Sequence, residues 1–171
     1  LYMTAGAATP VAEIKAALRQ NNQQMAFEPP DLDGLYGGDG TEPEGSIGGV
    51  IACNLAGPRR IQAGAARDHF LGFNAVSGRG EVFKSGGTVV KNVTGFDLSK
   101  LMAGSFGTLA VMTDVSFKVM PAAEKTRTVL VLGADDAGAM AAMASAMGSS
   151  NEVSAAAHLP EDAAALSSVS Y

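Results

Sequence analysis

The chain has 171 residues, of which 47% are hydrophobic, so it can bury a core as one domain or as one domain and part of another. Its net charge of −5 argues against a nucleic-acid-binding protein, which would carry clustered excess Lys and Arg. The single cysteine, Cys53, excludes a disulfide scaffold and fits a reducing compartment, and no apolar stretch is long enough to span a bilayer. We therefore expect a cytoplasmic protein.

The first quarter of the chain predicts a strand, a helix and a long loop. Residues 1–7 have strand character, and the Thr9-Pro10 pair has the residue types of an N-cap and a first helical position. Apolar residues at helical spacing then predict a helix that ends near Asn21-Asn22 (Val11, Ile14, Ala17, Leu18). Residues 28–45 are rich in acids, prolines and glycines, which predicts a surface loop.

The middle of the chain predicts a hairpin and a short helix. Residues 70–76 and 81–85 have strand character, and the Ser-Gly-Arg-Gly sequence between them is typical of a hairpin turn. Asp97 is the expected N-cap of a helix that stops at Gly104. The expected apolar face of this helix is Leu98, Leu101 and Met102.

The last third predicts two strands and a helix. Apolar residues at odd positions from 109 to 119 indicate a strand that Pro121 ends (Leu109, Val111, Val115, Phe117, Val119). Residues 126–132 predict a further strand, and residues 135–147 a helix whose methionines fill a core. We expect an α+β fold, a mostly antiparallel sheet with flanking helices, and a boundary that divides the chain into 1–121 and 122–171.

The stretch GSIGGVIACNLAGPRR, residues 45–60, places three glycines before an apolar run and two arginines after it. A Rossmann fingerprint does not fit, because the glycines follow an acidic loop rather than a parallel strand and have the wrong spacing. A phosphate-binding P-loop does not fit either, because no Gly-Lys-Ser/Thr follows. The stretch is therefore not a classical nucleotide motif.

Metal and nucleophile sites are also disfavoured. The acidic loop around Asp31 and Asp33 has Leu35 where an EF-hand needs an oxygen ligand, so a solvated loop is the better interpretation. His69 and His158 lie outside any recognisable nucleophile motif, and we interpret both as structural. No metal ligand set and no catalytic residue is predicted.

Two glycine-containing loops remain as candidates for ligand binding. The backbone N–H groups of Gly48 and Gly49 could face an anion, with hydrogen bonds and charge added by nearby side chains (Ser46, Asn54, Arg59, Arg60). The sequence GSFGTLAVMT, from Gly104 on, brings the chain tightly from a helix into a strand. Ordinary tight turns in a sheet domain explain both loops equally well.

Over roughly residues 1–121, the sequence resembles the FAD-binding domain of the vanillyl-alcohol oxidase family, which has the PCMH-type fold. Within that family it is most similar to the FAD-binding subunits of bacterial glycolate oxidases. The segments that carry the resemblance are GSIGGVIACNLAGPRR, AARDHFLGFNAV and GGTVVKNVTGFDLSKLMAGSFGTLAVMTDVSFKV, which occur in the same order and at close spacing.

This resemblance implies that both glycine-containing loops line an FAD cleft. The residues that it places at the cofactor are Ser46, Gly48, Gly49, Asn54, Gly57, Arg67, Gly107 and Val111. It also suggests that Lys91 faces the cleft, although an ion pair of Lys91 with Asp97 or Asp114 explains that residue equally well.

Three features depart from the family pattern. Ala110 replaces a common Gly and Phe96 a common Tyr, and neither change removes the motif. The family also has an earlier glycine-rich loop that cradles the pyrophosphate, and this chain starts after it. The third departure is that the following substrate domain is represented by its first elements alone. We therefore expect a fragment that is free of FAD or binds it weakly.

In the whole protein, the resemblance implies that FAD takes two electrons from a small 2-hydroxy acid such as glycolate. It also implies partner subunits that receive the electrons, namely a second flavin subunit and an iron–sulfur subunit, through which the protein can associate with a membrane. The alternative is a non-catalytic assembly subunit that keeps the flavin fold for docking.

Overall fold

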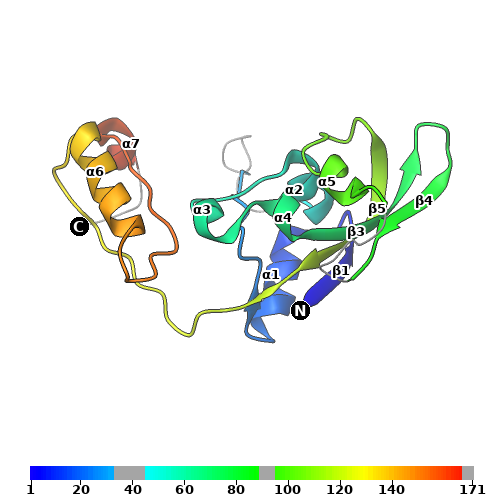
Figure 1. Cartoon of the computed structure of the whole chain (residues 1–171), viewed down its shortest axis with the longest axis horizontal. Helices are drawn as coiled ribbons and strands as arrows, with labels where there is room; N and C mark the ends of the chain where they lie inside the picture. Colours follow the sequence, from blue (N-terminus) through cyan, green and yellow to red (C-terminus); the bar gives the residue numbers. More distant parts are fainter. Residues whose placement is uncertain (33–44, 89–94, 167–171) are drawn as a thin grey trace. The chain divides into compact units, whose positions relative to one another are not determined.

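The computed structural model describes residues 1–32, 45–88 and 95–166 of the chain. Figure 1 shows their path. The chain divides into two units, Leu1–Ala123 and Glu124–Tyr171. None of the helices in the described ranges has the length and apolar character needed to cross a bilayer.

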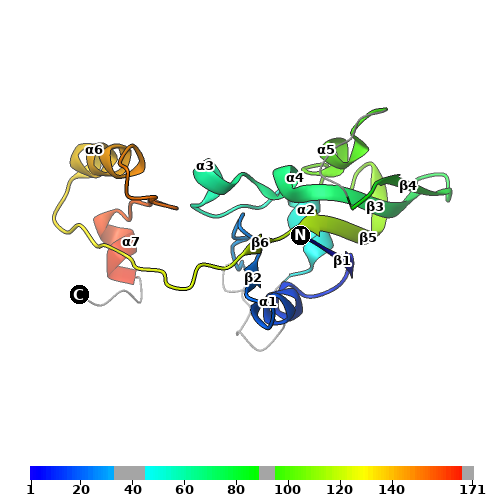
Figure 2. The ribbon, with the colours of Figure 1, turned by 60° about the horizontal axis from the view of Figure 1, so that its bottom comes forward.

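The first unit is built on a four-stranded antiparallel sheet with the strand order β1-β5-β3-β4. Its strands are β1 (Tyr2–Gly6), β3 (Phe70–Ser77), β4 (Val82–Gly86) and β5 (Ala110–Lys118). The short strands β2 (Gln23–Gln24) and β6 (Met120–Pro121) form a separate antiparallel pair, which lies near α1 in Figure 2. The expected α+β fold with an antiparallel sheet is confirmed, as is the hairpin formed by β3 and β4.

The described residues of the first unit also form five helices. They are α1 (Val11–Arg19), α2 (Ile47–Cys53), α3 (Arg60–Ala63), α4 (Ala66–His69) and α5 (Leu98–Met102). The buried face of α1 consists of Val11, Ile14 and Leu18, as the apolar spacing predicted. These side chains join one core with Ile51 of α2 and Phe117 of β5.

The strand β5 contains a bulge that changes which side chains are buried. Asn74 pairs with Asp114 but Ala75 pairs with Met112, so Thr113 has no partner on β3. An extra residue in one strand shifts the alternation of faces by one position. The prediction that Leu109 and Val111 share the buried face of Val115 is therefore wrong. Val111 is 68% exposed, and Leu109 is also exposed.

The starts of two helices differ from their predictions. Thr9 is not an N-cap, because its carbonyl accepts a hydrogen bond from Ile47 and Pro10 stays extended, so α1 begins at Val11. The N-cap of α5 is Asp97, as predicted, and its carboxylate accepts from the Lys100 N–H. The buried residues of α5 are Met102 and Ser99. Leu101, which was expected on the buried face, is 60% exposed.

The second unit contains α6 (Asp136–Met147) and α7 (Glu161–Leu166). Asp135 caps α6 by accepting a hydrogen bond from Gly138 N at 2.8 Å. The expected methionine core does not form, because Ala139 is the buried residue of α6 and Met140 is 62% exposed. Residues 126–132 are not a strand, because the described part of this unit contains no other strand with which they could pair.

We expect Phe117→Ala to lower the free energy of unfolding by about 3–5 kcal/mol, because it removes a buried ring and leaves a cavity. Phe117 is 1% exposed at the centre of the core. Urea denaturation followed by circular dichroism measures the change. The matched control is Val82→Ala on β4, where the side chain is 80% exposed and a loss below about 0.5 kcal/mol is expected. Equal losses in the two variants would contradict this account of the core.

Candidate functional site

An open groove of about 430 Å³ lies where the two glycine-containing loops meet. Its walls are the first turn of α2, the loop between α5 and β5, and the start of β5. Five residues expected at the cofactor line it: Ser46, Gly48, Gly49, Gly107 and Val111. Lining residues that the sequence analysis did not assign to a site are Ala7, Ala8, Ala52, Cys53, Phe106, Ala110 and Met112.

The first turn of α2 uses its own N–H groups within the chain. Ser46 is the N-cap and its hydroxyl accepts from Gly49 N at 3.2 Å. Gly48 N donates to the Ala7 carbonyl at 2.8 Å, and Ile47 N donates to Thr9. The interpretation that the Gly48 and Gly49 N–H groups are free to face an anion is therefore wrong for this structure.

The two glycines of this turn have different neighbours. A Cβ atom on Gly48 would lie 2.7 Å from the Ala7 carbonyl oxygen and 2.8 Å from the Ala7 Cβ. Glycine is needed there because α2 packs directly against the backbone that follows β1. A Cβ atom on Gly49 would meet the Ser46 hydroxyl alone, at 3.4 Å. Gly49 therefore leaves room in the groove, whereas Gly48 allows the close packing.

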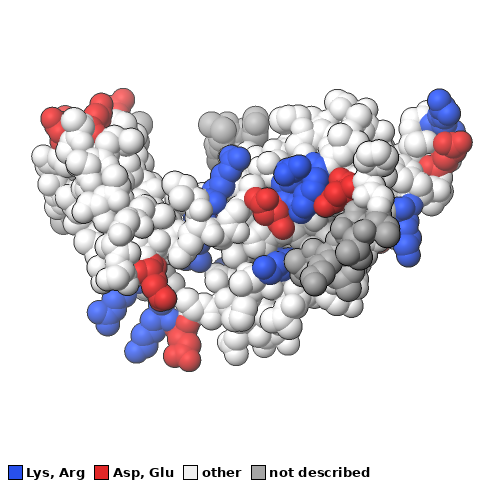
Figure 3. Space-filling model, viewed as in Figure 1, with Lys and Arg blue, Asp and Glu red and all other residues white. Residues whose placement is uncertain are grey.

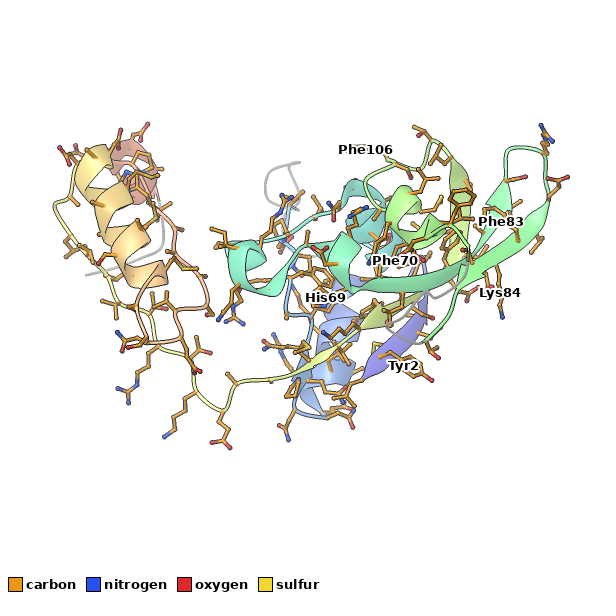
Figure 4. All side chains as sticks on the ribbon, viewed as in Figure 1. Tyr2, His69, Phe70, Phe83, Lys84 and Phe106 are labelled. Carbon is orange, nitrogen blue, oxygen red and sulfur yellow. The ribbon has the colours of Figure 1, made fainter. Side chains whose placement is uncertain are left out.

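The loop before β5 covers the other end of α2. Gly104 N donates to the Ile51 carbonyl at 3.2 Å, and Phe106 N donates to the Ala52 carbonyl at 2.9 Å. Both carbonyls lie in the last turn of α2, where a helix lacks its regular partners, and the Ile51 carbonyl also accepts from Asn54 N. Phe106 adopts a left-handed conformation with φ of 54°. Its side chain, labelled in Figure 4, is 72% exposed and lines the groove.

Asn54 and Arg67 do not line the groove but brace the elements around it. Asn54 ends α2 in a left-handed conformation, and its Oδ1 accepts from Arg67 N at 2.8 Å. Arg67 Nε donates to the Lys100 carbonyl at 3.0 Å, and the Lys100 ammonium donates to the carbonyls of Arg67 and Phe70. The hydrogen bonds between Arg67 and Lys100 hold α4 to α5, and the bond from Arg67 N to Asn54 attaches α4 to the end of α2.

Partial burial lowers the pKa of the Lys100 ammonium, and the carboxylates of Asp97 and Asp68 oppose that shift. The two carbonyls that accept from this ammonium replace part of the water that it loses. Lys100 therefore serves the packing of α4 against α5.

Gly57 and Arg59 also lie away from the groove lining. A Cβ atom on Gly57 would lie 2.5 Å from the Glu28 carbonyl oxygen, so glycine permits this close approach of two backbones. Arg59 forms an ion pair with Glu28 at 3.6 Å and donates to Gln24 Oε1 at 3.2 Å. Its charge is thus already engaged within the chain, contrary to the idea that it faces an anion.

The two histidines lie outside the groove as well. His69 is buried, its Nε2 lies 2.8 Å from the Ala63 carbonyl oxygen, and its ring centroid is 5.2 Å from that of Phe27 (Figure 4). His158 Nε2 lies 2.9 Å from Asp136 Oδ1 in the second unit. Lys91 and residues 33–44 of the acidic loop fall outside the described residues.

Charged side chains do not gather into one patch on the face that Figure 3 shows, as far as the described residues go. On the face shown in Figure 3, acidic and basic side chains intermingle and no continuous basic surface appears. Within the described ranges, no group of three His, Cys, Asp or Glu side chains comes together as a metal site. Among the described residues that line the groove there is no Lys, Arg, Asp or Glu, so these residues contact a ligand through apolar groups and backbone.

The sequence of this chain is similar to those of known oxidoreductases. The sequence is 46% identical over 121 residues to the glycolate oxidase subunit GlcE of Escherichia coli, which covers 71% of this chain and 32% of that protein. It is 40% identical over 102 residues to an FAD-linked oxidoreductase of Mycobacterium tuberculosis, which covers 60% of this chain and 22% of the relative. A D-lactate dehydrogenase of Anaerostipes hadrus is 33% identical over 121 residues, covering 71% of this chain and 25% of the relative.

Among solved structures, alkyldihydroxyacetonephosphate synthase matches 70% of this chain and 19% of its own, with a TM-score of 0.53 and 18% identity. This match shows the fold alone. No protein-family model matches the sequence.

The chain is homologous to FAD-linked oxidoreductases, which confirms the resemblance seen in its motifs. The relatives named above include proteins of 2-hydroxy acid metabolism, a glycolate oxidase subunit and a D-lactate dehydrogenase. The chain spans about a third or less of the length of these relatives.

We expect Gly48→Ala and Gly49→Ala to have opposite effects on stability. The new methyl group at position 48 would overlap the Ala7 backbone, which costs about 1–3 kcal/mol. At position 49 it fits, and the gain in helix propensity is worth about 0.5–1 kcal/mol. Thermal unfolding of the two variants provides the comparison. Similar destabilisation by both would show that the two glycines have the same role.

Asn54 offers a second test, because its side chain and its backbone conformation contribute separately. Asn54→Gly keeps the left-handed conformation but loses the acceptor for Arg67 N, at a cost of about 0.5–1.5 kcal/mol. Asn54→Ala also introduces strain of about 1 kcal/mol in that conformation. The midpoint of denaturant unfolding should therefore fall further for the alanine variant. Equal midpoints would mean that the left-handed conformation is not retained in solution.

Proposed function

We propose that this chain contributes part of the FAD site of an oxidoreductase subunit that oxidises a 2-hydroxy acid such as glycolate. The observation that carries the proposal is the 46% identity over 121 residues to the E. coli glycolate oxidase subunit. The groove supports it, because it is formed by the two loops that the motifs place beside a cofactor.

The groove fits an apolar, planar part of FAD but not its diphosphate. Phe106 and Val111 expose apolar side chains at the groove, and Gly49 leaves one wall without a side chain. The described lining residues include no cationic side chain, and the N–H groups of the first turn of α2 already have acceptors. Contacts to the diphosphate would then come from residues other than the described lining residues. For that reason, we propose weak binding of FAD by this chain alone.

The eight residues expected at the cofactor then have two kinds of role. The residues of this set that line the groove would border the cofactor, namely Ser46, Gly48, Gly49, Gly107 and Val111. Phe106, which also lines the groove, would border it with them. Asn54, Gly57 and Arg67 would act as positioning residues, through the brace to α4 and the close approach to Glu28.

FAD, when bound, supplies the redox chemistry by accepting two electrons from the substrate. This chain would orient the cofactor and exclude water from one side of it. The resemblance supports further proposals for the whole protein: residues 1–121 form the FAD-binding subdomain, and residues 122–171 begin the domain that follows. It also supports transfer of electrons to a second flavin subunit and an iron–sulfur subunit, in the cytoplasm or at a membrane through those partners.

The second candidate function is that of an assembly subunit that keeps the flavin fold without catalysis. One observation favours it, namely that Cys53 is the one ionisable side chain among the described residues that line the groove. Without an acid–base group, these residues could hold a flavin but could not move a proton from a substrate hydroxyl.

Titration of FAD with this chain, followed by flavin fluorescence, tests the proposed site. We expect weak binding that Gly49→Ala weakens by about tenfold, or ~1.4 kcal/mol, because the added methyl group enters the groove. Val82→Ala, which is outside the groove lining, is the control. Tight binding by the unmodified chain would contradict the proposal that the diphosphate contacts lie elsewhere. No binding at any FAD concentration would favour the assembly subunit.

A further inference from the structure

Three residues outside the groove lining join the helices α2, α4 and α5. Asn54 Oδ1, at the end of α2, accepts from Arg67 N of α4, and Arg67 Nε donates to the Lys100 carbonyl of α5 at 3.0 Å. The Lys100 ammonium returns to α4 by donating to the Arg67 carbonyl. The helix α4 lies beside both α2 and α5 in Figures 1 and 2.

The chain that follows α5 returns to α2 and closes a ring of contacts. The N–H groups of Gly104 and Phe106 donate to carbonyls in the last turn of α2. The ring therefore runs from α2 through α4 and α5, and back to α2 along the loop before β5. Phe106 and Gly107, at the end of the ring, form one wall of the groove. The position of this wall thus depends on how α5 is held.

Lys100 holds α5 to two elements at once. Its ammonium donates to the Arg67 carbonyl of α4 and, at 3.2 Å, to the carbonyl of Phe70, the first residue of β3. Hydrogen bonds from a charged donor are stronger than those from a neutral one. If the ammonium were removed, both carbonyls would lose this donor in a partly buried position, which is unfavourable. Lys100 is therefore central to the ring.

The conformation of Phe106 indicates that the wall is held against a local preference. Its φ of 54° lies in the left-handed region, which residues other than glycine seldom adopt. Such a conformation persists where the surrounding structure imposes it. If α5 were released, the bond from Phe106 N to α2 would weaken and this backbone could relax. The wall is then the part of the groove that would move.

We propose that Lys100 is a positioning residue for the groove. It closes the ring through α2, α4 and α5, and thereby fixes the wall that contains Phe106 and Gly107. Lys100 is not itself among the residues that line the groove. The proposal rests on the proposed function in one respect, namely that the groove is part of an FAD site. The ring and the wall are features of the chain without any cofactor.

The reactivity of Cys53 reports the position of the wall. It is the single cysteine of the sequence, it is half-buried, and it lines the groove. We expect its thiol to react with Ellman's reagent about tenfold faster in Lys100→Met than in the unmodified chain, because local opening of the wall becomes easier. Methionine matches lysine in helix propensity, so the substitution removes mainly the ammonium.

Two further variants test whether the ring is the cause. Lys100→Arg keeps a charged donor and should react at the rate of the unmodified chain. Arg67→Met removes the bond from Arg67 Nε to the Lys100 carbonyl, which opens the ring at a second place, and should also accelerate the reaction. A fast Lys100→Met that Lys100→Arg does not restore would overturn the proposal, since the effect would not depend on a charged donor.

Two control variants separate positioning from a general loss of stability. Lys84→Met removes an ammonium from an exposed position on β4, outside the groove lining, and should leave the rate unchanged. Val119→Ala removes a core side chain that is 1% exposed and belongs to neither the ring nor the groove lining. It should change the rate by less than about twofold, because the thiol reacts through local opening of the folded chain. Circular dichroism shows whether each variant is folded.

Equal rates for Lys100→Met and the unmodified chain would overturn the proposal. Equal acceleration by Lys100→Met and Val119→Ala would also overturn it, since the effect would then be one of general stability.

Titration of the same variants with FAD tests the link to the cofactor separately. Lys100→Met should bind FAD about tenfold more weakly than Lys100→Arg, because the wall no longer has a fixed position. Absence of FAD binding in every variant would contradict the proposed function, whereas the thiol rates would still decide the role of Lys100. Equal FAD affinities despite a faster thiol reaction would also contradict the proposed function, since the cofactor would then lie away from this wall.

Discussion

The backbone of Ala7, just after β1, makes two hydrogen bonds on which the shape of the groove depends. Its N–H donates to the Thr113 carbonyl at the bulge of β5, and its carbonyl accepts from Gly48 N at the start of α2. One residue thus links β1, β5 and α2, and the link requires a glycine at position 48 because a Cβ atom would overlap Ala7. The same bulge turns Val111 from the core to the groove.

The far end of α2 is held just as firmly, by N–H groups of Gly104 and Phe106. A helix of seven residues gains too few internal hydrogen bonds to be stable alone, so it depends on these contacts at both of its ends. The groove is therefore a surface defined by backbone and apolar side chains that these hydrogen bonds position. Such a surface suits the flat part of the proposed cofactor, and the described lining residues carry no charge that could neutralise a phosphate.

Local patterns predicted those elements that depend on nearby residues. The turn between β3 and β4, the cap at Asp97 and the buried face of α1 all follow from residues close in sequence. The prediction was wrong where a distant segment decides the outcome. The Thr9 carbonyl accepts from Ile47 N instead of Thr9 capping a helix, and residues 126–132 form no strand with the described residues, because a strand needs a partner.

The sequence by itself determined the family relationship, the α+β class and five of the residues that line the groove. These features can be read directly from the order of the motifs and the spacing of the glycines along the chain. The tertiary structure alone decided what each residue does. Gly48 serves packing, Asn54 and Arg67 form a brace, and Phe106 lines the groove. The physical reason is that these roles depend on hydrogen bonds and close approaches between segments far apart in sequence, which no local pattern records.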